Sequence, residues 1–430
     1  MTSVFQFDAA QYIGDVEPSL VCSDPPYYDN IGYADLSDFF YVWLRRSLGE
    51  FYPDLFSTLL TPKTQELIAT PYRFGDDMEK AEEHFLTGLR KAFQRMRECS
   101  HHDYPLTVFY AFKQTEEDED NDGDSSSAIA STGWETMLEG LLTTGFQIIG
   151  TWPMRTERPT GVKDKVNALA SSIVLVCRSR AEDTPLSTRR EFITALRREL
   201  PDALRKLQQG NVAPVDFAQA SIGPGMAIFS RYAKVLEADG SPMRVRAALQ
   251  LINQELDAYL AEQEGDFDTD TRFCVAWFEQ RGMEEGVFGE ADVLARAKNT
   301  AVEGLVRAGV LEAKAGKVRL LRREEYPENW SPAEDNRLTV WEGMQHLICA
   351  LERGGEEAAS RLSNLLGGGR SEDARALAYR LYAICERKGW AQEALAYNTL
   401  VVSWTDVQAK TASVVREGEQ TYLFGGGDKP

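Results

Sequence analysis

The residues whose types and spacing could do chemistry lie between positions 23 and 29, which read Ser-Asp-Pro-Pro-Tyr-Tyr-Asp. Two consecutive prolines have fixed φ angles and lack backbone donors, so they hold the Pro25 carbonyl in a nearly fixed geometry between Asp24 and Tyr27. A carboxylate, a free carbonyl and an aromatic face suit a planar base: its exocyclic amine donates to Asp24 and Pro25, and its ring stacks on Tyr27. We therefore interpret Asp24, Pro25, Pro26 and Tyr27 as a candidate catalytic site for a nucleobase amine.

Other interpretations of this stretch stay open at the level of sequence. It can be a purely structural turn, and Pro-Pro-Tyr is also a ligand of small aromatic-groove domains. Those ligands lie in polar tails, whereas this motif stands between an apolar run, residues 18–22, and an apolar segment, residues 36–48. Tyr28 is either a second stacking surface for the base or a side chain that packs under the motif.

The elements around the motif are those of an α/β sheet. The apolar run before it predicts a buried strand with the motif at its carboxyl edge, where open α/β sheets place their ligands. Further strands are expected over residues 4–8, 106–112, 146–152 and 172–178. The spacing of apolar residues predicts helices over residues 36–48, 78–99 and 127–144, and we expect the first of these helices to be buried.

The motif and its continuation resemble a known family. Asp-Pro-Pro-Tyr is similar to the catalytic motif of DNA methyltransferases that act on the amino group of adenine N6 or cytosine N4. The longer string over residues 23–46, and a second string, Ile222-Gly-Pro-Gly-Met-Ala-Ile-Phe-Ser-Arg-Tyr232, resemble the large adenine-specific DNA methylases that carry a zinc ribbon and an N-terminal domain of unknown function. The resemblance covers residues 1–265 and corresponds to the C-terminal part of that family.

The resemblance implies a fold, an activity and a cofactor. The fold is α/β: the catalytic half of a Rossmann-like methyltransferase sheet with an antiparallel final hairpin, followed by a mostly helical C-terminal region. The activity is transfer of a methyl group from S-adenosylmethionine to a flipped base of double-stranded DNA, most favourably adenine N6. Asp8, at the end of the first strand, would meet the adenine of the cofactor, with Asp24 close by. Asp8 can equally cap the turn that follows it.

The sequence contains no Phe-x-Gly-x-Gly turn before Asp8, which only seven residues precede. A methyltransferase sheet uses such a turn to approach the methionine end of the cofactor with its backbone. We therefore expect a protein partner that completes the sheet and supplies the glycine-rich loop, and we expect the chain alone to bind S-adenosylmethionine weakly or not at all. The alternative is a catalytically inactive DNA-binding or assembly subunit of a methylation or defence complex, derived from a methylase.

A basic loop follows the strand expected over residues 146–152. Its cations can contact backbone phosphate of DNA, or the loop can simply be a solvated surface segment. They are Arg155, Arg158, Lys163 and Lys165.

Four regions are expected along the chain. Residues 1–180 are the partial catalytic domain, and residues 181–268 are a helical extension with a turn at 222–225. Residues 269–327 combine three helices and a hairpin around Gly316, which indicates either a winged helix or a helical dimerisation or packing unit. Residues 328–430 are helical with a flexible tail. Their apolar stripe is interpreted as core: Leu338, Trp341, Met344, Leu347 and Leu351.

Charge and cysteine usage limit the function further. The net charge of −20 has the wrong sign for a nucleic-acid binder. Arginine outnumbers lysine and acids are abundant, so we infer a halophilic source, where a Debye length of about 3 Å at molar salt weakens repulsion of DNA. The six cysteines form no Cys-x-x-Cys pair, which argues against a disulfide framework and against a metal site in this chain. No membrane span and no secretory signal are expected, so we predict a cytoplasmic protein.

Overall fold

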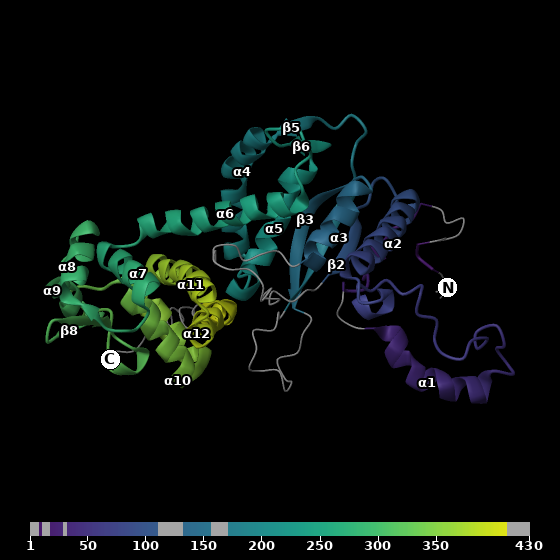
Figure 1. Cartoon of the computed structure of the whole chain (residues 1–430). Helices are drawn as coiled ribbons and strands as arrows, with labels where there is room; N and C mark the ends of the chain where they lie inside the picture. The colour runs from purple at the N-terminus through teal and green to yellow at the C-terminus, as the bar shows by residue number, and fades with distance from the viewer. Residues whose placement is uncertain (1–7, 11–17, 29–31, 111–131, 156–170, 411–430) are drawn as a thin grey trace, which may run out of the picture. The chain divides into compact units, whose positions relative to one another are not determined.

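The computed structural model of the chain describes residues 8–10, 18–28, 32–110, 132–155 and 171–410 (Figure 1). The fold is mixed α/β, with a mixed sheet and a helical C-terminal region. It divides into two compact units, residues 1–200 with 219–252, and residues 201–218 with 253–430. The finer division into four domains, made from the sequence, stays a prediction.

A four-stranded sheet organises the first unit. Strand β1 pairs with β2 in parallel, and β4 is antiparallel to both of its neighbours, β2 and β3. Three strands, β1, β2 and β3, therefore point in the same direction, and their carboxyl ends lie at the same edge of the sheet. In their order across the sheet the strands are β1 (Cys22–Ser23), β2 (Leu106–Tyr110), β4 (Ser171–Ser179) and β3 (Phe146–Arg155).

Helices α2 (Met78–Cys99) and α3 (Thr132–Thr143) lie side by side against one side of this sheet (Figure 1). Helix α2 begins where the sequence predicts, because the Asp77 carboxylate accepts a hydrogen bond from the Lys80 N–H at 3.1 Å and so caps the first turn. Each fully buried aromatic side chain at this interface contributes about 1.5–3 kcal/mol by leaving water. The buried side chains of the interface include Phe85, Leu89, Phe93, Trp134 and Leu138.

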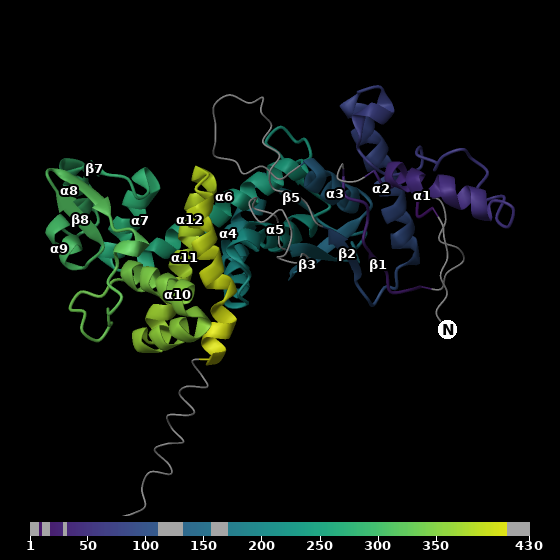
Figure 2. The same ribbon diagram turned by 90° about the horizontal axis from the view of Figure 1, so that it is seen from below.

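Helix α1 (Tyr33–Leu48) confirms the helix predicted over residues 36–48, but the prediction that it is buried is wrong. Ala34 is its only buried residue. Figures 1 and 2 show α1 standing away from the sheet, and the side chains that would bury its apolar surface are not among the described residues of this chain.

The turn predicted at residues 222–225 is also wrong, because these residues lie inside helix α5 (Pro214–Ser230). Glycine at 223 and 225 serves close packing here rather than a turn. A Cβ on Gly223 would stand 1.9 Å from the Thr151 hydroxyl oxygen on β3, and one on Gly225 would stand 2.6 Å from Ile252. Ser230 reinforces this contact, since its hydroxyl accepts a hydrogen bond from the Ile148 N–H at 3.0 Å.

Two short strands and two helices complete this part of the chain. Strands β5 and β6 pair in parallel as a separate small sheet, and the boundaries between the two units fall within α4, α5 and α6. Their bounds are β5 (Leu186–Thr188), α4 (Arg189–Gln209), β6 (Lys234–Leu236) and α6 (Val245–Gln263).

The second unit contains a small α/β region followed by three long helices. The hairpin expected around Gly316 is confirmed, and β7 joins it to give the sheet order β7-β9-β8. The stripe expected to be core is buried at Trp341, Met344 and Leu347. The elements are α7 (Thr269–Arg281), β7 (Gly286–Val287), α8 (Phe288–Ala297), α9 (Val302–Arg307), β8 (Leu311–Lys314), β9 (Lys317–Leu320), α10 (Val340–Leu366), α11 (Gly368–Lys388) and α12 (Ala391–Val402).

Candidate active site

The motif of residues 24–27 follows β1 directly, at the edge where β1, β2 and β3 end. Pro25 is buried. Pro25 and Pro26 fix the backbone φ angles in the middle of the motif. Asp24 is exposed, and its Oδ1 accepts a hydrogen bond from the Tyr27 hydroxyl at 3.3 Å. The carboxylate is thus held beside the aromatic ring and stays open to a donor from outside the chain.

Tyr27 is supported by a series of aromatic rings from neighbouring elements. Its ring meets Tyr110, the last residue of β2, edge to face, with centroids 5.4 Å apart. Tyr110 is buried, donates its hydroxyl to the Gly133 carbonyl at 3.2 Å and stacks on Trp134, with centroids 5.6 Å apart. Pairs of this kind contribute about 0.5–1.5 kcal/mol each beyond their burial. Tyr27 itself is half-buried.

Tyr28 packs beneath the motif. Its side chain is 5% exposed, its ring meets Phe85 of α2 edge to face, and its hydroxyl donates to Glu82 Oε1 at 2.7 Å. Its carbonyl accepts the Ala69 N–H at 2.8 Å. Of the two sequence interpretations of Tyr28, these contacts agree with packing rather than with stacking on a base.

Gly133, near the start of α3, lets this helix approach the motif closely. A Cβ at this position would lie 2.9 Å from the Tyr28 Cβ and 3.1 Å from the Tyr110 hydroxyl oxygen. Both neighbours are buried and cannot move aside, so only glycine fits. The beginning of α3, the end of β2 and the motif are therefore packed as one block.

Asp8 is exposed and caps a turn, because its Oδ1 accepts the Ala10 N–H at 2.9 Å. This agrees with the capping interpretation. The rest of the strand expected over residues 4–8 lies outside the described residues.

The basic loop begins at the same edge as the motif, because β3 is parallel to β1 and ends at Arg155. Arg158, Lys163 and Lys165 lie outside the described residues, as does the side chain of Arg155. Trp152, near the carboxyl end of β3, is 69% exposed. Sequence reasoning missed Trp152, because only the sheet order shows that β3 ends at the same edge as the motif, with β2 and β4 between β3 and β1.

These residues fit part of S-adenosylmethionine. The exposed carboxylate of Asp24 is an acceptor for a donor of a ligand at this edge. None of the four described strands of this sheet is followed by a glycine-rich turn, so the described residues offer no cradle for the methionine end. The described residues therefore supply an acceptor group and an aromatic face, and no cradle for the methionine end is among them.

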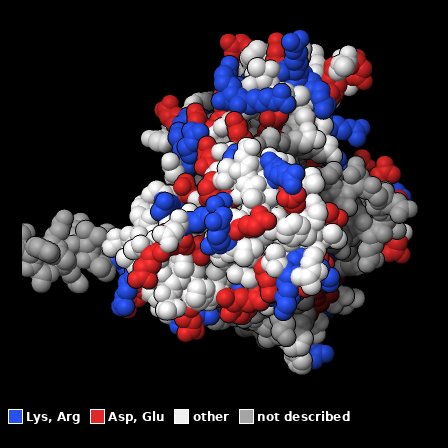
Figure 3. Space-filling model, turned by 90° about the vertical axis from the view of Figure 1, so that its left-hand side faces the viewer, with Lys and Arg blue, Asp and Glu red and all other residues white. Residues whose placement is uncertain are grey.

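Several basic side chains of the α7–β9 region of the second unit pair with acids. Lys317 pairs with Glu285 at 2.7 Å, and Arg319 pairs with Glu325 at 2.6 Å. Acidic and basic side chains are also interspersed on the face drawn in Figure 3. Paired cations release few counterions on binding phosphate, so Lys317 and Arg319 are poorly suited to contact DNA.

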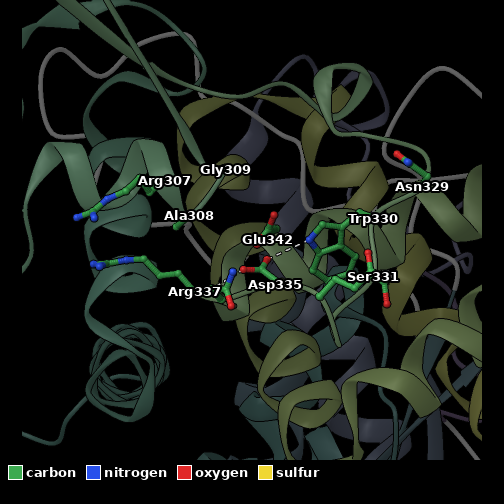
Figure 4. A pocket seen from close by; sticks show the side chains of 11 residues that line it. Arg307, Ala308, Gly309, Asn329, Trp330, Ser331, Asp335, Arg337 and Glu342 are labelled. Atoms are coloured by element: carbon green, nitrogen blue, oxygen red, sulfur yellow. Dashed lines mark hydrogen bonds between the residues drawn. The ribbon is translucent and has the colours of Figure 1, made fainter.

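A second polar cluster, which the sequence analysis missed, lines a hollow of about 680 Å³ in the second unit (Figure 4). The Trp330 indole donates to Asp335 Oδ2 at 3.1 Å and stacks on His346, with ring centroids 4.0 Å apart. Burial and a hydrogen bond to Asp335 raise the pKa of Glu342 to about 9, and burial lowers the pKa of His346 to about 4. Both groups are therefore neutral at pH 7, and Asp335 and Glu342 share one proton.

Among the described residues, no helix is long and apolar enough to cross a membrane. Within the same residues, no group of three or more His, Cys, Asp or Glu side chains could hold a metal ion.

Comparison with known proteins finds one family match. Residues 268–423 match the model of the family described as Domain of unknown function (DUF8807). The match begins one residue before α7 and runs across residues 327–328, where the sequence analysis places a domain boundary. No curated protein and no solved structure matches the chain.

Proposed function

We propose that this chain is the base-binding, catalytic part of a DNA amino-methyltransferase that uses S-adenosylmethionine, with adenine N6 as the favoured target. One observation carries the proposal: Asp24-Pro-Pro-Tyr27 stands at the shared carboxyl edge of parallel strands, with an exposed carboxylate beside a supported aromatic ring. Open α/β sheets bind their ligands at this edge.

The chemistry that these residues would perform is positioning and activation of the base. A base amine is a poor nucleophile, because its lone pair is delocalised into the ring. Hydrogen bonds from the amine to Asp24 and to the Pro25 carbonyl favour its pyramidal form and aim the lone pair. Tyr27 stacks on the flipped base, which contributes about 1–3 kcal/mol. When bound, S-adenosylmethionine supplies the electrophilic methyl group.

The topology of the sheet supports this proposal. It also supports a methyl-transfer site that is divided between two chains. Strand β4 runs antiparallel between β2 and β3, which agrees with the final hairpin that the family resemblance implies. Strand β1 pairs with β2 on one side and with no described strand on the other. We propose that a partner chain completes the sheet at this edge and supplies the glycine-rich loop.

The alternative is an inactive assembly subunit, and the α7–β9 region is the observation that favours it. The order helix, strand, helix, helix, strand, strand supports a winged helix, and its paired cations support packing against protein rather than contact with DNA. Under this alternative the motif is a relic of a methylase and the purified assembly transfers no methyl group.

The experiment that separates the two is methyl transfer by the assembly that forms around this chain. Radiolabelled S-adenosylmethionine and duplex DNA are the substrates. We expect Asp24→Ala to lower the rate about 100- to 1,000-fold, the loss typical of one preorganised polar contact to the reacting group. Asp183→Ala, at an exposed aspartate in the turn before β5, is the matched control and should keep the wild-type rate. A rate within tenfold of wild type for Asp24→Ala would remove Asp24 from the mechanism.

A further inference from the structure

Helix α1 and the segment after it expose an unusual amount of apolar surface. Thirteen of the twenty-seven large apolar side chains exposed in the described residues lie between Tyr33 and Leu60. We call this the α1 surface. Its six aromatic rings are 58% to 75% exposed: Tyr33, Phe39, Phe40, Trp43, Phe51 and Tyr52.

The area of the α1 surface is that of a protein interface. Each aromatic side chain has about 150–250 Å² to bury. At the observed exposure the six rings present roughly 700 Å², and with the aliphatic side chains between them the surface reaches roughly 1,000 Å². A monomeric protein rarely exposes more than a few hundred Å² of contiguous apolar surface. A stable complex buries about 800 Å² on each partner.

The polar side of α1 holds the helix in place with its rings outward. Arg73 pairs with Asp35 at 2.6 Å and Lys63 pairs with Asp38 at 2.7 Å. The Arg45 guanidinium donates to the Phe56 carbonyl at 3.2 Å. These contacts fix α1 against residues 55–73 of its own chain, so the apolar side is ordered before anything binds to it, which lowers the entropy cost of association.

We propose that the α1 surface is the docking site for the partner chain that supplies the glycine-rich loop. The helix begins five residues after Tyr28, so it follows the motif closely along the chain, and β1 pairs with no described strand on its other side. Under this proposal the partner covers the rings and also pairs with β1. The exposed side chains alone define the α1 surface. The identification of its occupant as the chain with the glycine-rich loop rests on the proposed function. A second copy of this chain also lacks the loop and would leave the site incomplete.

The test uses the full chain, tagged and purified from its own cells with the chains bound to it, which mass spectrometry then identifies. We expect a stoichiometric partner whose sequence contains a strand, a Phe-x-Gly-x-Gly turn and a helix. The double variant Phe40→Glu/Trp43→Glu should weaken binding of that purified partner by at least about thirtyfold, the loss typical of one interface hot spot. Leu395→Glu, 61% exposed on α12, is the matched control and should bind like wild type.

The outcomes separate the docking site from the proposed function. Circular dichroism should show that the double variant folds, because both side chains are exposed and glutamate is a good helix former. A second copy as the sole partner, a partner without the glycine turn, no partner, or unchanged affinity of the double variant would each overturn the docking proposal. An assembly that forms through the α1 surface but methylates no DNA would keep the docking site and refute the proposed function.

Discussion

Replacing the buried Glu342 with glutamine should stabilise the second unit at neutral pH, whereas most changes to buried side chains destabilise a protein. Glu342 is 4% exposed on α10 and lies beside Asp335. Burial and the hydrogen bond to Asp335 raise its pKa from 4.5 to about 9, so the folded protein holds this proton at pH 7. Glutamine imitates the protonated acid permanently and can donate to Asp335.

The magnitude follows from proton linkage. Between pH 4.5 and about 9 the folded state binds one proton more than the unfolded state at this site. The free energy of unfolding of the wild type therefore falls as pH rises, by up to about 1.4 kcal/mol per pH unit. At about pH 7.5, three pH units above the pKa in the unfolded state, the free energy of unfolding of the wild type has fallen by up to about 4 kcal/mol. Relaxation of the protein around the carboxylate and entry of water reduce this loss. We expect Glu342→Gln to be more stable by about 2–4 kcal/mol there.

The assay is urea unfolding of both proteins from pH 5 to pH 8.5. The advantage of the variant should be near zero at the acid end and should grow with pH. Glu357→Gln changes an exposed glutamate of the same helix and should show a small, pH-independent difference. His346, with its pKa lowered to about 4, makes both proteins less stable as pH falls below 6.5. The reasoning is refuted if Glu342→Gln is less stable than wild type at pH 7.5, or if its advantage does not change with pH.

Four further predictions concern the motif and the charge of the chain. Tyr27→Ala should weaken base binding about 5- to 150-fold in a steady-state assay, whereas Tyr27→Phe should leave base binding nearly unchanged, because stacking needs no hydroxyl. The phenylalanine variant also removes the 3.3 Å bond to Asp24, so a large loss of methyl-transfer rate would give the hydroxyl a role in holding that carboxylate. Tyr28→Phe removes the 2.7 Å bond to Glu82 and should lower the free energy of unfolding by about 1–2 kcal/mol, measured in urea. Gly133→Ala should cost about 1–3 kcal/mol through overpacking, and an unchanged midpoint would contradict the close packing described here. The melting temperature should rise with KCl concentration, and full stability without salt would count against a halophilic origin.

The sequence predicted correctly those elements whose formation depends on residues close together in the chain. Helix α2 begins and ends where its apolar spacing predicts, because Asp77 caps it and Phe85, Leu89 and Phe93 share one face. The hairpin around Gly316 was predicted from a turn residue between two apolar runs, and its φ of 77° shows why glycine stands there.

The features that were predicted wrongly depend on contacts with residues far along the chain, or on the lack of such contacts among the described residues. The glycines at 223 and 225 serve contact with Thr151 and Ile252, and no local signal distinguishes this from a turn. The apolar content of α1 predicted burial wrongly, because no described residue covers its aromatic rings.

The Glu342 cluster was missed because its members come together only through the fold. Trp330 and Asp335 belong to the segment before α10, and Glu342 and His346 belong to α10 itself. Nothing in the local sequence distinguishes this glutamate from a solvated one. The motif was found because its chemistry is local, whereas the support of Tyr27 by Tyr110 was not predictable without the sheet order.

The central claim is that the methyl-transfer site is divided between this chain and a partner. Calorimetric titration with S-adenosylmethionine tests it most directly, first on the isolated chain and then on the assembly purified with it. We predict no micromolar binding by the isolated chain and micromolar binding by the assembly, weakened by Asp8→Ala. Micromolar binding by the isolated chain would contradict the claim, because the described residues offer no cradle for the methionine end of the cofactor.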